Sequence, residues 1–255
     1  MEENQTQIHL PEEEERDFPP KRRQTWPKRL IALLVACALL FFSFAYLMRL
    51  SDLPPIDLLI TSRQLTKDET IRSWTKAVVG ITADSRSGTG FILAPDNIIV
   101  TNRHILEEAR QLTVRMSRNE YVVSEWFDCQ DEDLALIPLP EETNSEDLTS
   151  LPLETELSPE PGDKLTLIGN PQGLFRVACP ATFAGFVSDE KKQRVAVYGA
   201  IYKGNSGSPV INDRGHVIGI VFASATTSDQ KKDEVMGLLI PAEVIRQAVE
   251  MRKDK

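Results

Sequence analysis

The chain has 255 residues, of which 41% are hydrophobic and 26% charged, and its formal net charge is −9. These fractions are ordinary for a soluble globular domain. The negative charge lies in residues 50–255, because the seven acidic and six basic side chains of residues 1–29 nearly cancel and Arg49 offsets the difference. This acidity argues against nucleic acid or anionic lipid as a partner.

The first 29 residues are polar and contain four prolines, so we predict a disordered tail over 1–29. Residues 30–48 then carry no formal charge and would form a helix of about 28 Å, enough to cross a bilayer. The run is longer than the usual core of a signal peptide, and no small-x-small cleavage site follows it. We therefore predict an uncleaved transmembrane helix over 30–48, with a cleaved signal peptide as the alternative.

Basic residues set the expected orientation of this span. Five of them, Lys21, Arg22, Arg23, Lys28 and Arg29, crowd the stretch 21–29 directly before it. Only Arg49 and Arg63 fall within the first fifteen residues after it. The positive-inside rule then predicts a single-pass protein of the inner or plasma membrane, with a cytoplasmic N-terminus and the rest periplasmic or extracellular.

The remainder of the chain is predicted as a stem over 49–70 and one domain over 71–255. Pro54-Pro55 favours an extended start to the stem. Strand-like runs with turn signals between them follow at 77–82, 90–93, 97–101, 112–116, 121–127, 134–139, 164–169, 181–188, 194–199, 208–212, 216–223 and 235–240. The acidic stretch 140–150 divides them into two sets, and a helix with one apolar stripe follows Pro241. This pattern predicts an all-β barrel fold with a C-terminal helix.

Three short patches point to chemistry: VTNRHIL around His104, DEDLALIPL around Asp133 and GNSGSPV around Ser206. A serine hydroxyl becomes nucleophilic when an imidazole takes its proton, and a carboxylate holds that imidazole in the right tautomer. The other two histidines fit the role of base poorly, since His9 lies in the acidic tail and His216 in a turn that opens a strand. The order His, Asp, Ser predicts acyl-transfer catalysis.

Five segments together resemble the trypsin-like serine peptidases of the HtrA/Deg branch. They are SGTGFILAPDNIIVTNRHIL (87–106), DEDLALI (131–137), IGNPQGL (168–174), AIYKGNSGSPVINDRGHVIGI (200–220) and GLLIPAEVI (237–245). The resemblance covers roughly residues 70–250. It implies two antiparallel six-stranded β-barrels with the catalytic groups in the cleft between them. HtrA-like proteins commonly continue into a PDZ module, for which the chain has no room, so we expect none.

The resemblance assigns roles residue by residue. It makes His104 the general base, Ser206 the nucleophile and Asp133, which directly precedes Leu-Ala-Leu, the orienting acid. Asp131 and Glu132 are rival acids, which we interpret as a solvated turn. The oxyanion donors would be the backbone N–H groups of Gly204 and Ser206, with that of Asn205 nearby. The chain departs from the family at Ser208, where glycine is more common.

The resemblance also implies a primary substrate pocket lined by Ile201, Val221 and Ala223. These side chains predict a small apolar pocket, although Ile201 could instead belong to the core. No sequence pattern indicates a metal or a cofactor. Cys129 and Cys179 fall in different barrels, and we expect two thiols rather than a disulfide between them.

We therefore predict a membrane-anchored serine endopeptidase that cleaves unfolded or extended polypeptides. The lipid bilayer would be a partner through residues 30–48, and nucleic acid would not. One alternative is a catalytically silent protein of the same fold that binds peptides or other partners. Another is an interaction protein that works through its cytoplasmic tail. The sequence does not predict the oligomeric state.

Overall fold

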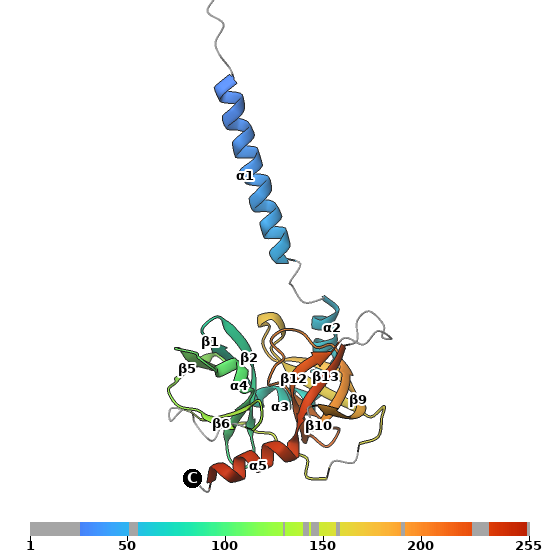
Figure 1. Cartoon of the computed structure of the whole chain (residues 1–255). Helices are drawn as coiled ribbons and strands as arrows, with labels where there is room; N and C mark the ends of the chain where they lie inside the picture. Colours follow the sequence, from blue (N-terminus) through green and yellow to red (C-terminus); the bar gives the residue numbers. More distant parts are fainter. Residues whose placement is uncertain are drawn as a thin grey trace, which may run out of the picture. The chain divides into compact units, whose positions relative to one another are not determined.

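The computed structural model describes residues 26–50, 56–129, 131–139, 143, 148–156, 159–189, 192–225 and 235–253. They belong to two compact units, one within Met1–Ser51 and one within Asp52–Lys255, whose elements are labelled in Figure 1. Most of the predicted disordered tail and most of the acidic stretch 140–150 lie outside the described residues.

The first unit contains one helix, α1 (Trp26–Leu50), which includes all of the predicted span. Its part Trp26–Tyr46 is long and apolar enough to cross a membrane, and none of its side chains is buried by protein. A signal sequence near an N-terminus has the same properties.

The first half of the second unit is an open antiparallel sheet, which corrects the prediction of a closed six-stranded barrel. Its seven strands run in the order β5-β4-β1-β2-β3-β7-β6. They are β1 (Val78–Ala83), β2 (Arg86–Leu93), β3 (Ile98–Thr101), β4 (Leu112–Met116), β5 (Asn119–Val123), β6 (Phe127–Cys129) and β7 (Leu134–Pro138).

The sheet stays open because the run predicted as one strand over 121–127 divides in two. β5 ends at Val123 and β6 begins at Phe127, and the three residues between them lie in neither strand. β5 pairs with β4, whereas β6 pairs with β7 at the opposite edge. Because β6 has only three residues, little backbone remains to join the two edges.

The second half forms the closed six-stranded barrel that the sequence predicts, in the order β10-β13-β12-β11-β8-β9. Its strands are β8 (Lys164–Gly169), β9 (Val177–Asp189), β10 (Lys192–Gly199), β11 (Pro209–Ile211), β12 (Val217–Ala225) and β13 (Val235–Pro241). A short 3-10 turn, η2 (Pro171–Gly173), connects β8 to β9.

Helices cover parts of this unit. The predicted C-terminal helix is α5 (Ala242–Lys253), and it buries Ile245, Ala248 and Val249 as its apolar stripe predicts. Two further helices, α2 (Ile56–Leu65) and α3 (Glu69–Ala77), were not predicted. The Asp68 side chain caps α3 by accepting the Thr70 N–H at 2.8 Å.

The hydrophobic core has three parts, and one of them lies between the two halves. Each half encloses a cluster of its own, and a third cluster joins the halves and α5. It includes Phe91 and Leu136 from the open sheet, Ile168 and Ile220 from the barrel, and Ile245 from α5. This shared core holds the loops of the two halves next to each other. All three cysteines are free in the structure.

Candidate active site

His104 stands on a one-turn helix, α4 (Arg103–Leu106), directly after β3. The residues that follow it, Ile105 and Leu106, are buried in the core of the open sheet. Their burial fixes the position of the turn, while the His104 side chain remains 46% exposed to solvent. A short buried anchor thus presents the imidazole at the surface.

Asp133 holds this histidine by two contacts. One carboxylate oxygen lies 2.6 Å from His104 Nδ1, and the other accepts the backbone N–H of His104 at 2.9 Å. Strand pairing brings the residues together, since Thr101 at the end of β3 lies opposite Ala135 in β7. When the carboxylate accepts a hydrogen bond from Nδ1–H, the lone pair of Nε2 is free to accept a proton.

The two rival acids lie elsewhere. Glu132 pairs with Arg194 at 2.8 Å and with Lys192 at 3.3 Å, both on β10. Its side chain is only 15% exposed, so the interpretation of Glu132 as part of a solvated turn was wrong. Asp131 is exposed, and its carbonyl oxygen accepts a hydrogen bond from Lys192.

The pair of Glu132 and Arg194 joins the two halves of the unit. Glu132 directly precedes Asp133, at the start of β7 in the open sheet, whereas Arg194 belongs to the closed barrel. The Arg194 guanidinium is almost fully buried and lies 4.9 Å from the ring centroid of Phe222 on β12. This contact therefore links the acid-bearing turn to the barrel.

Ser206 lies in a tight loop that is fixed on both sides. Its carbonyl oxygen accepts the Thr89 N–H of β2 at 2.8 Å, and the next amide, of Gly207, donates to Val221 of β12 at 2.8 Å. Gly207 has a φ of +82°, and a Cβ there would lie 2.0 Å from the Thr89 carbonyl oxygen. Only glycine permits this close approach.

The loops of His104 and Ser206 meet at Gly88. A Cβ on Gly88 would lie 2.3 Å from Ile105 Cδ1 and 3.2 Å from the Ser206 carbonyl oxygen. Among the contacts of these described residues there is no hydrogen bond between the His104 ring and the Ser206 hydroxyl. Catalytic hydrogen bonds are often long without substrate and tighten in the complex.

The peptide unit between Lys203 and Gly204 is held in place by Gln172. The Lys203 carbonyl accepts the Gln172 N–H at 2.7 Å. Because the two ends of a trans peptide unit point in opposite directions, the Gly204 N–H points away from Gln172. Within the described part of the chain, neither the Gly204 N–H nor the Ser206 N–H has an acceptor.

Three supporting residues had no assigned role in the sequence analysis. Thr89 Oγ1 donates to the Gly204 carbonyl at 2.8 Å and accepts the Asn170 N–H at 2.9 Å. Asn170 also donates to the Val79 carbonyl at 2.8 Å, and Gln172 holds Lys203 as described. The motif IGNPQGL marks this loop in the sequence. The hydrogen bonds that Asn170 and Gln172 make from it are visible only in the folded chain.

The residues of the predicted substrate pocket lie on the barrel side. Ile201 and Val221 are buried in the barrel core, and Ala223 is partly exposed. Ile201 Cδ1 occupies the space above Gly237 of β13, where a Cβ would lie 2.1 Å from it.

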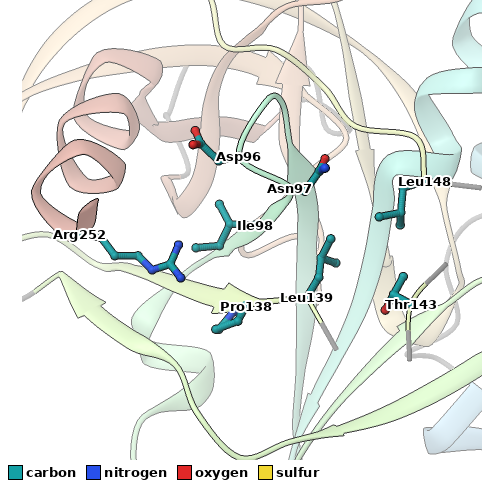
Figure 2. A pocket seen from close by; sticks show the side chains of 8 residues that line it. All are labelled: Asp96, Asn97, Ile98, Pro138, Leu139, Thr143, Leu148 and Arg252. Carbon is teal, nitrogen blue, oxygen red and sulfur yellow. The ribbon is translucent and has the colours of Figure 1, made fainter. Parts of the chain in front are cut away.

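Cavities elsewhere do not coincide with this site. One of about 310 Å³ lies between the start of β3, the end of β7 and Arg252 of α5. Figure 2 shows the side chains that line it. A larger one, of about 1110 Å³, lies between β6 and α5. None of His104, Asp133 and Ser206 lines either cavity.

Comparison with known proteins identifies relatives of this arrangement. Residues 88–220 match the model of the trypsin-like peptidase domain. The serine endoprotease DegS of Haemophilus influenzae is 24% identical over 164 residues, which are 62% of this chain and 47% of DegS. A DegP-like periplasmic serine endoprotease of Marinomonas sp. is 32% identical over 141 residues, 53% of this chain and 29% of the relative. The chain thus spans less than half the length of these two relatives.

Solved structures share the fold. The active form of the Rv3671c protease from M. tuberculosis has a TM-score of 0.60 at 22% identity, over 73% of this chain and 85% of that one. The serine endoprotease from Yersinia pestis has a TM-score of 0.58 at 23% identity, over 72% of this chain and 65% of that one. The matched segment 88–220 is just over half of the chain and contains His104, Asp133 and Ser206. With its DegS and DegP-like relatives, this chain belongs to the family of trypsin-like peptidase domains.

Proposed function

We propose that this protein is a serine endopeptidase with Ser206 as nucleophile, His104 as general base and Asp133 as orienting acid. The observation that carries the proposal is the double contact of Asp133 with His104, at 2.6 Å to the ring and 2.9 Å to the backbone. Its relatives, which are named serine endoproteases, support the same reaction.

In the proposed reaction the Ser206 hydroxyl attacks the carbonyl carbon of a peptide bond while His104 Nε2 takes its proton. The tetrahedral intermediate collapses, the C–N bond breaks, and the imidazolium gives the proton to the leaving amine. Water then attacks the acyl-enzyme with His104 as base again, and Ser206 recovers its proton as the acid product leaves. Asp133 keeps its charge and stabilises the imidazolium.

The amides of Gly204 and Ser206 would bind the oxyanion of each intermediate. Their lack of acceptors and the orientation of the Lys203 peptide support this role. The side chain before the cleaved bond would rest near Ile201, whose Cδ1 lies close to Gly237. We therefore propose a preference for small apolar residues such as Val, Ala or Ile.

The substrates we propose are extended or unfolded chains. A peptide that binds as an added strand must offer free backbone N–H and C=O groups, which a folded domain does not. We expect the full chain in detergent to cleave a reduced, unfolded protein much faster than the same protein in its native, disulfide-bonded form. The Ser206→Ala variant measures background hydrolysis. Equal rates on both forms would instead indicate a sequence-specific processing enzyme.

We further propose that α1 anchors the peptidase in the inner or plasma membrane, with its N-terminus in the cytoplasm. Its length, its apolar composition and the basic residues before it support this topology. A reporter that is active only in the exported compartment should work when fused after Lys255 and remain silent when fused after Arg29 without the span. Recovery of a soluble mature protein that starts near residue 50 would show a cleaved signal sequence instead.

One observation favours the second candidate, a catalytically silent protein that binds peptides. The His104 ring and the Ser206 hydroxyl are described, yet no hydrogen bond joins them. A silent protein would bind extended peptides without turnover and would leave Ser206 unreactive toward a fluorophosphonate. Covalent labelling of Ser206 by that reagent would exclude this candidate.

A further inference from the structure

Helix α2 carries an apolar face that the described residues of its own unit leave exposed. Its inner side packs on the barrel, where Leu58 is buried and the Ser62 hydroxyl accepts the Ala178 N–H at 3.0 Å. On another side Ile56, Leu59 and Ile60 remain exposed by 74%, 36% and 47%. These positions are spaced i, i+3 and i+4, so they form one stripe along the helix.

The position of α2 in the chain indicates what covers this stripe. Leu50 ends α1 and Ile56 begins α2, so five residues separate the two helices. Such a link spans at most about 20 Å when fully extended. The headgroup region of a bilayer is about 5 to 8 Å thick on each side. If α1 crosses the membrane, the start of α2 cannot move far from the headgroups.

Helix α2 carries one acidic and one basic residue, Asp57 and Arg63, which balance each other and fit a zwitterionic lipid surface. Arg63 lies seven residues after Ile56, on the same side of the helix, and it is exposed. Among the described residues its guanidinium pairs with no carboxylate, so it is free to reach a lipid phosphate. Residues 50–255 carry the whole net charge of −9, so attraction to anionic lipid cannot drive the contact. Burial of apolar side chains is the force that remains.

We propose that α2 is an interfacial helix that inserts Ile56, Leu59 and Ile60 into the outer boundary of the bilayer. The proposal rests on the anchoring by α1 proposed above. A second copy of the chain is the competing occupant, and the stripe's place directly after the span favours lipid. The contact holds one face of the peptidase domain on the membrane and restricts the directions from which substrates reach it.

The test uses the full chain in phosphatidylcholine nanodiscs with a nitroxide on one cysteine at a time. Ile60→Cys is made in a background in which Cys37 and Cys129 are alanine. Cys179 can stay, because it is buried and burial raises the pKa of its thiol to about 12, so it reacts poorly. The matched control is Val122→Cys on β5, an apolar residue that is 73% exposed.

We expect oxygen to relax the label at position 60 more than a water-soluble nickel chelate does, and the reverse at position 122. A second label, from Ile56→Cys, should behave like that at position 60. A label on Cys37 alone reports the span, and it should be accessible to oxygen only.

Each other outcome overturns the proposal in a distinguishable way. If the Cys37 label is in lipid but the labels at 56 and 60 behave like that at 122, α2 stays in water although the anchor is present. If the label at 60 is shielded from both reagents and shows dipolar broadening, a second copy covers the stripe. If the Cys37 label is exposed to nickel, the anchoring by α1 has failed, and the interfacial contact with it.

Discussion

Replacing Ser206 or His104 with alanine is expected to reduce kcat by a factor of about 10⁶, while the fold is retained. The factor is this large because the serine is a weak nucleophile without its base, and the base has nothing to activate without the serine. Single-turnover and steady-state cleavage of an unfolded protein by the full chain measures the loss. Circular dichroism and thermal melting check the fold. A double variant should be no slower than either single variant.

The acid can be tested separately by Asp133→Asn, for which we expect a loss of about 10⁴ in kcat through the wrong imidazole tautomer. The control is Asp131→Asn, two residues earlier and exposed, which should leave kcat within a factor of about two, as expected for a surface position. If both variants were equally impaired, Asp133 would not be the orienting acid. A fluorophosphonate label recovered on a serine other than Ser206 would contradict the choice of nucleophile.

The Gly204→Ala variant is expected to lose a factor of about 10² to 10³ in kcat, the usual effect of removing one oxyanion donor. Gly204 has a φ of +97°, and a Cβ there would lie 2.5 Å from the Asn170 carbonyl oxygen. Since the Asn170 carbonyl belongs to the backbone and cannot rotate aside like a side chain, the loop must shift, and the Gly204 N–H then leaves its position. KM for a short peptide should change little, because the donor acts mainly on the transition state.

The Gly162→Ala variant serves as the control for the effect of backbone strain alone. Gly162 has a similar φ of +102°, but its surroundings are open, since no atom would lie within 4 Å of a Cβ added there. We expect this variant to lose stability through strain and to keep its kcat. Loss of activity in both variants to the same extent would mean that the Gly204 effect is conformational strain and not a displaced donor.

Local patterns predicted much of the fold. β4 and β8 have the predicted bounds, 112–116 and 164–169, because their strand signals are carried by the residues themselves. The run 121–127 was predicted as one strand although Ser124 and Glu125 interrupt its strand-forming residues, and in the structure β5 and β6 pair with different partners. For α3 a readable signal was missed, because Asp68 is a favourable N-cap residue.

The candidate site was likewise predictable from the sequence only in part. Histidine, aspartate and serine are recognisable by residue type and order, because their chemistry limits which side chains can serve. The contact between Gln172 N–H and the Lys203 carbonyl joins backbone groups of separate loops, and any residue except proline offers the same donor. Likewise, the sequence alone does not indicate that the side chains of Glu132 and Arg194 form an ion pair, because 62 positions of chain separate them. Such contacts depend on the packing of the two halves.

The ion pair between Glu132 and Arg194 has a consequence for how activity responds to stress on the protein. The proposed acid and base belong to the open sheet, and the proposed nucleophile lies in a loop of the closed barrel, so hydrolysis requires the two halves to stay docked. The ion pair sits one residue from Asp133. A chain whose halves separate slightly would retain its strands and its far-ultraviolet spectrum, yet it would already be inactive. Loss of turnover is therefore expected to report separation of the two halves before any measure of secondary structure does.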